Sequence, residues 1–154
     1  MHTVNLKRLT YVTAGMSIVA GLIHGLVTPE HFAEWWGYGL FFFVATFAQV
    51  AYGVLLLLRP WAYDTSGGER NDVDTDRRTI LFYAAGIVGN LVIIGLWMVT
   101  RTAGIPFFGP GAGEVEQVTL ISLASKLVEA ALIVCLAWMI QRMRATSHGT
   151  GVTA

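Results

Sequence analysis

The chain has 154 residues, of which 55% are hydrophobic and only 13% are charged, and its ten basic residues balance its ten acidic ones. Soluble domains carry about 25% charged residues. This composition therefore excludes an ordinary water-soluble domain, a disordered chain and a protein that binds nucleic acid through a basic surface. The single cysteine, Cys135, also excludes a disulfide-stabilised scaffold.

Four long apolar segments follow one another along the chain, at residues 9–27, 35–58, 79–100 and 118–140. A bilayer core takes about 20 helical residues to cross, so each segment is long enough to span it. Strands of a membrane barrel alternate in hydrophobicity over about ten residues, and these segments do not alternate. The sequence therefore predicts an all-α integral membrane protein, a single domain that folds as a four-helix transmembrane bundle.

Basic residues gather on one side of the predicted spans. Eight of them lie before the first span, between the second and third, or after the fourth, and only Arg101 lies in the other two connections. Because cytoplasmic loops carry the excess of Lys and Arg, this bias places both termini and the loop of residues 59–78 in the cytoplasm. The predicted location is the plasma membrane, with the lipid bilayer as one partner. Other membrane subunits, or further copies of the chain, are the remaining candidate partners.

The connection between the first two spans has the pattern of a helix start. Thr28 is a good N-cap, Pro29 suits the first helical position, and Glu30 favours the positive end of the helix dipole. We therefore expect the second helix to begin here and to form a tight hairpin with the first. The basic pair before the first span would also suit a signal peptide. The apolar run is long and no small-residue cleavage site follows it, so a retained helix is expected.

The connection between the last two spans, residues 104–113, alternates turn-forming and apolar residues. We expect a stiff turn whose Phe107 and Phe108 rest on the headgroups. The alternative is a loop that folds back over the end of the bundle. The tail, residues 145–154, is rich in Ser, Thr and Gly and is expected to be flexible.

Small residues mark the places where the predicted helices can approach closely. Six glycines of the first three spans are candidates for such contacts: Gly15, Gly21, Gly37, Gly53, Gly86 and Gly89. Close approach at these positions predicts a compact bundle without a large central cavity.

Polar residues inside the predicted spans are the main candidates for function. A charged side chain at the centre of a membrane helix costs about 2.5–3.5 kcal/mol on insertion scales, so such residues are expected to face the bundle interior. Four residues of the fourth span form one polar stripe at helical spacing, and two amides of the second and third spans reach a similar depth. These six residues are Ser122, Ser125, Lys126, Glu129, Gln49 and Asn90.

Two interpretations of this polar centre remain open. The functional one is a proton or cation relay, or a site for a polar head group, formed by Glu129, Lys126, Asn90 and Gln49. The structural one is an ion pair between Lys126 and Glu129, tied to the two amides by interhelical hydrogen bonds. Such bonds average well under 2 kcal/mol in membranes, so alone they barely offset two insertion penalties.

A second candidate site lies near the outer end of the first two spans. If the hairpin is tight, His24 faces His31 and Glu34, and two imidazoles with one carboxylate can bind zinc, copper or iron. The alternative is that His24 bonds a neighbouring helix while His31 and Glu34 are solvated. No motif in the sequence calls for a cofactor. The cofactor that the residues suggest is a metal ion at this outer face.

The sequence contains no P-loop, dinucleotide-binding, zinc-protease or nucleophile-elbow motif. This absence favours a protein that is not an enzyme: a subunit or accessory of a membrane complex, or a protein that binds a lipid-like ligand among its helices. The first alternative is transport of a proton, a cation or a small solute through the polar centre. The second is a metal or redox role at His24, His31 and Glu34.

Overall fold

The computed structural model describes residues 6–63, 68–69 and 73–149. Over these residues the chain forms four long helices and one short 3-10 helix: α1 (Leu6–Glu34), α2 (Trp36–Leu58), η1 (Pro60–Ala62), α3 (Val73–Thr102) and α4 (Leu120–Gly149). All four long helices are long and apolar enough to cross a membrane. The all-α fold with four membrane-length helices is therefore confirmed.

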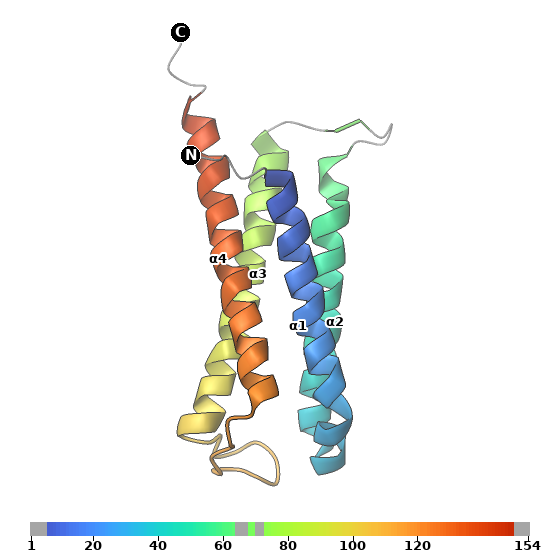
Figure 1. Ribbon diagram of the computed structural model, residues 1–154, viewed down its shortest axis with the longest axis vertical. Coiled ribbons are helices and arrows are strands. Elements are labelled where there is room, and N and C mark those ends of the chain that lie inside the picture. Colours follow the sequence, from blue (N-terminus) through green and yellow to red (C-terminus); the bar gives the residue numbers. More distant parts are fainter. Residues whose placement is uncertain (1–5, 64–67, 70–72, 150–154) are drawn as a thin grey trace.

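The helices run side by side along the longest axis of the molecule and alternate in direction (Figure 1). The start of α1, the end of α2, the start of α3 and the end of α4 lie at one end. The turn from α1 to α2 and the connection from α3 to α4 lie at the other, which we call the loop end. Helix α1 packs along α2 and also against α4, and α3 packs against α4. Through α1, side chains of the first hairpin therefore reach the second.

Large apolar side chains cover the outside of all four helices. Exposed examples are Leu22 on α1, Phe47 on α2, Leu91 on α3 and Val134 on α4. The interior holds an apolar cluster that includes the fully buried Leu56, Leu132, Leu136 and Met139. It also holds buried polar side chains from every long helix, which is where the candidate sites lie.

Helix α1 is longer than expected, and the helix start predicted at Thr28 is wrong. The helix continues through Pro29 to Glu34, and the chain reverses at the extended residue Trp35. Thr28 does not cap a new helix, because its hydroxyl donates to His24 O at 2.8 Å within α1. Hydroxyl side chains and neighbouring helices are what allow proline inside membrane helices.

The turn from α1 to α2 is held by rings that lie on glycine backbone. A Cβ atom at Gly37 would overlap the Trp35 ring, and one at Gly39 would overlap the Phe32 ring. The reversal therefore takes place about two turns later than the cap-like residues suggest. As a consequence, His31 and Glu34 lie on the last turns of α1 and not on the first turns of the second helix.

Two other helices extend past their apolar runs. Helix α3 begins at Val73, six residues before the predicted span, with Asp74 and Asp76 in its first turn, where the helix dipole favours acidic groups. Helix α4 continues to Gly149, so residues 145–149 of the tail are helical. Residues 150–154 of the tail, and residues 64–67 and 70–72 of the predicted cytoplasmic loop, lie outside the described part of the chain.

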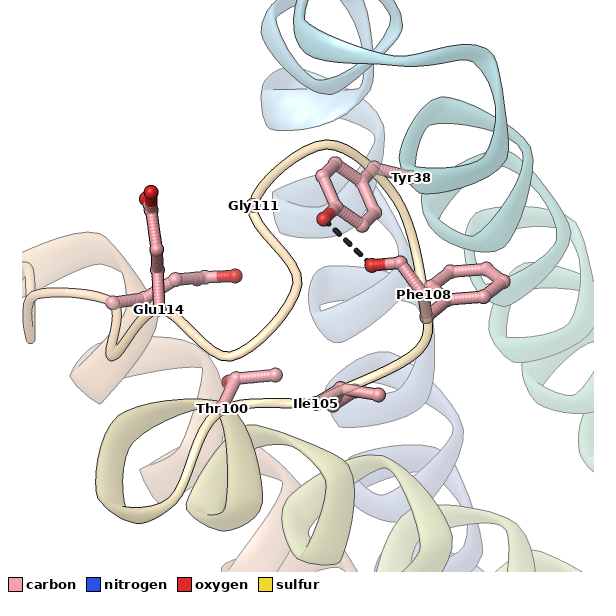
Figure 2. A pocket seen from close by; sticks show the side chains of 7 residues that line it. Tyr38, Thr100, Ile105, Phe108, Gly111 and Glu114 are labelled. Atoms are coloured by element: carbon pink, nitrogen blue, oxygen red, sulfur yellow. Dashed lines mark hydrogen bonds between the residues drawn. The ribbon is translucent and has the colours of Figure 1, made fainter.

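The connection from α3 to α4 leans against the turn between α1 and α2, as Figure 2 shows from close by. The Tyr38 hydroxyl donates to Phe108 O at 2.9 Å, and the Phe108 ring meets the Trp35 ring edge-on with centroids 4.9 Å apart. Phe107, in contrast, is 86% exposed. The two phenylalanines therefore have different environments: Phe108, which is 41% exposed, contacts the turn between α1 and α2, and Phe107 faces outward.

Candidate functional site

Three polar side chains converge on the Glu129 carboxylate in the half of the bundle nearer the loop end. Lys126 Nζ donates to Glu129 Oε2 at 2.6 Å. Ser125 Oγ donates to the other oxygen, Oε1, at 3.1 Å, and His24 Nε2 lies 2.8 Å from the same atom. We call His24, Ser125, Lys126 and Glu129 the ionic cluster.

The ionic cluster is withdrawn from solvent. Glu129 is 0% exposed, Ser125 2%, His24 4% and Lys126 8%. Charges in such a position are tolerated only when they are paired and their remaining hydrogen-bonding capacity is used. Both oxygens of Glu129 have partners, so the buried carboxylate is paired.

Helical spacing and one interhelical contact assemble this cluster. Ser125 and Lys126 precede Glu129 by four and three residues on α4, which places all three on one helix face. His24 comes from α1, ten residues or about 15 Å before that helix ends at Glu34. The bond between His24 and Glu129 therefore joins the first helical hairpin to the second.

A second set of polar side chains joins α1, α2 and α3. Gln49 Nε2 donates to Asn90 Oδ1 at 3.2 Å, and Asn90 Nδ2 donates to Gly86 O at 2.8 Å. Ser17 Oγ donates to the backbone oxygen of Gln49 at 2.7 Å. We call Ser17, Gln49 and Asn90 the amide cluster, and all three side chains are buried.

The amide cluster has one unsatisfied atom, the side-chain oxygen of Gln49, which is buried without a hydrogen-bond partner in the described structure. Gln49 also lines a cavity of about 150 Å³ between α1, α2 and α3. Its lining comprises Ser17, Ala48, Gln49, Tyr52, Ala85, Gly86, Gly89, Asn90 and Ile93. The Gln49 oxygen itself has almost no accessible surface, and an acceptor that is buried without a partner costs about 1–3 kcal/mol.

The six predicted residues of the polar centre do not form one site. Ser125, Lys126 and Glu129 belong to the ionic cluster, whereas Gln49 and Asn90 bond each other in the amide cluster. Ser122 belongs to neither. It exchanges hydrogen bonds with Thr119 at the start of α4, because a helix N-terminus leaves N–H groups that such side chains satisfy.

The three predicted metal-binding residues do not form one site, because His24 lies apart from His31 and Glu34. His24 Nε2 bonds Glu129, as the alternative interpretation had it. His31 lies with its Nδ1 3.2 Å from Glu34 Oε2, and its ring stacks on Phe42 with centroids 4.0 Å apart. Among the residues that the structure describes, no group of three His, Cys, Asp or Glu side chains is placed to hold a metal ion. The structure thus gives the metal hypothesis no support.

Sequence reasoning missed two features of these clusters. It ended the first helix at residue 27, so His24 was expected near the outer end of that helix. Because α1 continues to Glu34, His24 lies deeper in the bundle, where it contacts Glu129. It also passed over Ser17 and Tyr52, which line the cavity. A signal for Ser17 was present, since a serine within an apolar span needs a hydrogen-bond partner.

Comparison with known proteins does not assign this chain to a family. No protein-family model, curated protein or solved structure matches it. The function is therefore inferred from the two clusters and the cavity.

Proposed function

We propose that this chain is an integral membrane protein that spans the bilayer four times and binds a lipid-soluble ligand in the cavity between α1, α2 and α3. The observation that carries the proposal is the cavity of about 150 Å³ itself, in which Gln49, Asn90 and Tyr52 lie among small and apolar residues. Largely apolar pockets with a few placed polar groups are the usual form of small-molecule sites.

The surface of the bundle supports membrane insertion. Each of the four helices exposes large apolar side chains, and an exposed apolar surface of this extent marks a membrane or partner contact. The basic residues outside the helix centres lie mostly at the end opposite the loop end, which by the positive-inside rule faces the cytoplasm. Both termini are then cytoplasmic and the loop end is outside.

This orientation predicts which positions react with a membrane-impermeant thiol reagent. In a Cys135→Ser background, we expect Phe107→Cys to be labelled on intact cells because Phe107 is exposed at the loop end. Glu69→Cys, placed in the connection between α2 and α3, should be labelled only after the membrane is permeabilised. Gel-shift assays measure both, and the reverse pattern would contradict the orientation.

The shape of the cavity supports entry from the lipid. Three of its lining residues, Ala48, Ala85 and Gly89, are exposed, and all three are small. They belong to α2 and α3, so the opening faces sideways from the bundle and not toward either end. Gln49 lies near the middle of α2, which places the site at mid-bilayer depth.

Filling the cavity should remove the ligand. A Cβ atom at Gly89 meets nothing within 4 Å, so Gly89→Leu is expected to place a side chain in the cavity without displacing a helix. Gly95→Leu is the matched control, because Gly95 is on the same helix, is equally open and does not line the cavity.

The measurement is mass spectrometry of organic extracts from the purified variants. We expect an apolar molecule to co-purify with the wild type and with Gly95→Leu, and to be lost from Gly89→Leu. If all three proteins carry the same molecules in the same amounts, ligand binding in this cavity is rejected.

Ligand binding is better supported than transport through Glu129, Lys126, Asn90 and Gln49. These residues divide between two clusters, and both oxygens of Glu129 already have partners. The role that fits the ionic cluster is to hold α1 against α4, so that the helices bordering the cavity keep their spacing.

A further inference from the structure

Positive charge is distributed unevenly at the end of the bundle opposite the loop end. From this distribution we propose that the start of α1 and the end of α4 together bind the headgroup of an anionic phospholipid. The proposal depends on membrane insertion and not on a ligand in the cavity. Four exposed residues form the site, which we call the basic surface: Lys7, Arg8, Arg142 and Arg144.

The basic surface belongs to two helices that carry no acidic residue at this end. The acidic residues of α1 and α4 are Glu30, Glu34 and Glu129, which all lie toward the loop end. The segment of residues 59–78, in contrast, holds four basic and five acidic residues. The positive-inside rule accounts for basic residues at this end but not for their collection on two of the four helices.

The cations of α2 and α3 have acidic neighbours. Arg59 Nη1 lies 3.9 Å from Glu69 Oε1. Arg78 follows Asp74 by four residues on α3, the spacing at which opposite charges on a helix meet. Basic residues near a membrane surface attract anionic lipids, so the basic surface is the part of this end that attracts them most strongly.

The register of α1 and α4 brings the two parts of the basic surface to a similar depth. Thr13 Oγ1 donates to Met139 Sδ at 3.7 Å, and the two helices run in opposite directions (Figure 1). Arg8 precedes Thr13 by five residues and Arg144 follows Met139 by five, so the two arginines are level. Arg142 lies about 3 Å deeper, at a rise of about 1.5 Å per residue.

Two of these arginines extend rows of exposed apolar side chains. Arg8 precedes Val12, which is 55% exposed, by four residues. Arg142 follows the exposed Trp138 by four residues, and its guanidinium carbon lies 5.5 Å or less from that ring, at 5.4 Å from the centroid. Residues four apart share a helix face, so both arginines lie where the lipid-facing surface ends. Phosphate groups lie at this depth, and arginine binds them with paired N–H groups.

The test measures lipid binding to the purified full chain by native mass spectrometry. Phosphatidylglycerol and phosphatidylcholine with the same acyl chains are titrated separately into the micelles. Each basic residue near a membrane surface contributes a factor of about five in affinity. We therefore expect the wild type to prefer the first phosphatidylglycerol over phosphatidylcholine by at least about thirtyfold, the effect of two arginines.

Two double variants with the same loss of charge separate a site from overall charge. Arg8→Gln/Arg142→Gln should weaken phosphatidylglycerol binding by about thirtyfold and leave phosphatidylcholine binding unchanged. Arg77→Gln/Arg78→Gln, which changes exposed residues at the start of α3, should weaken it by less than about threefold. A third variant, Arg8→Lys/Arg142→Lys, keeps both charges and should retain most of the affinity.

Two outcomes would overturn the proposal. Equal affinities of the wild type for the two lipids would reject the binding of an anionic headgroup. Equal losses in the two glutamine variants would reject its placement on α1 and α4. Neither outcome bears on the cavity, which the extraction experiment tests separately.

Discussion

Replacing Glu129 with alanine is expected to destabilise the protein by about 3–5 kcal/mol, the usual cost of removing one partner from a buried ion pair. Lys126 and His24 remain buried after the substitution, and both lose the carboxylate that they contact. Ser125 loses its acceptor as well. Reversible unfolding of the purified protein in mixed micelles of increasing SDS content measures the change.

Two comparisons show whether the loss comes from the unpaired charge. Glu34→Ala removes a carboxylate that is 60% exposed and pairs with His31, so it should change the free energy of unfolding by less than about 1 kcal/mol. The triple variant His24→Leu/Lys126→Met/Glu129→Leu removes every charge of the ionic cluster and should recover most of the stability. An effect of Glu129→Ala no larger than that of Glu34→Ala would contradict a paired, buried cluster.

The helices could be predicted from the sequence because their apolar runs are long, but their ends could not. The predicted second span differs from α2 by one residue, since a turn and Arg59 bound the run on its two sides. The first predicted span ends at residue 27, seven residues before the end of α1 at Glu34. Thr28 and Pro29 are compatible with a helix start and also with the interior of a membrane helix. Only the packing of Phe32 on Gly39, and of Trp35 on Gly37, decides between the two.

The candidate sites could be predicted in part. The pair of Lys126 and Glu129 follows from helical spacing, and the contact between Gln49 and Asn90 follows from their matching depth. The division into two clusters could not be predicted, because it depends on how each helix is rotated about its axis. These helices carry large apolar side chains on their exposed faces too, so the periodicity that orients a soluble helix is weak here.

The interface of α1 with α2 gives the other large expected effect. A Cβ atom at Gly21 would lie 2.9 Å from Thr46 O, and one at Gly53 would lie 2.8 Å from Ala14 O. Backbone oxygens inside a neighbouring helix cannot move aside as flexible side chains do. Gly21→Ala and Gly53→Ala are therefore each expected to force the helices apart and to cost about 1–3 kcal/mol, as overpacked cores do.

Gly15→Ala is the matched control for these substitutions, because it is on α1 and its added methyl group meets nothing within 4 Å. Alanine favours helix over glycine by about 1 kcal/mol, so the control should be neutral or slightly stabilised. The same SDS titration compares the variants. Variants at Gly21 and Gly53 that are as stable as Gly15→Ala would contradict the close approach of α1 and α2, and with it the spacing that forms the cavity.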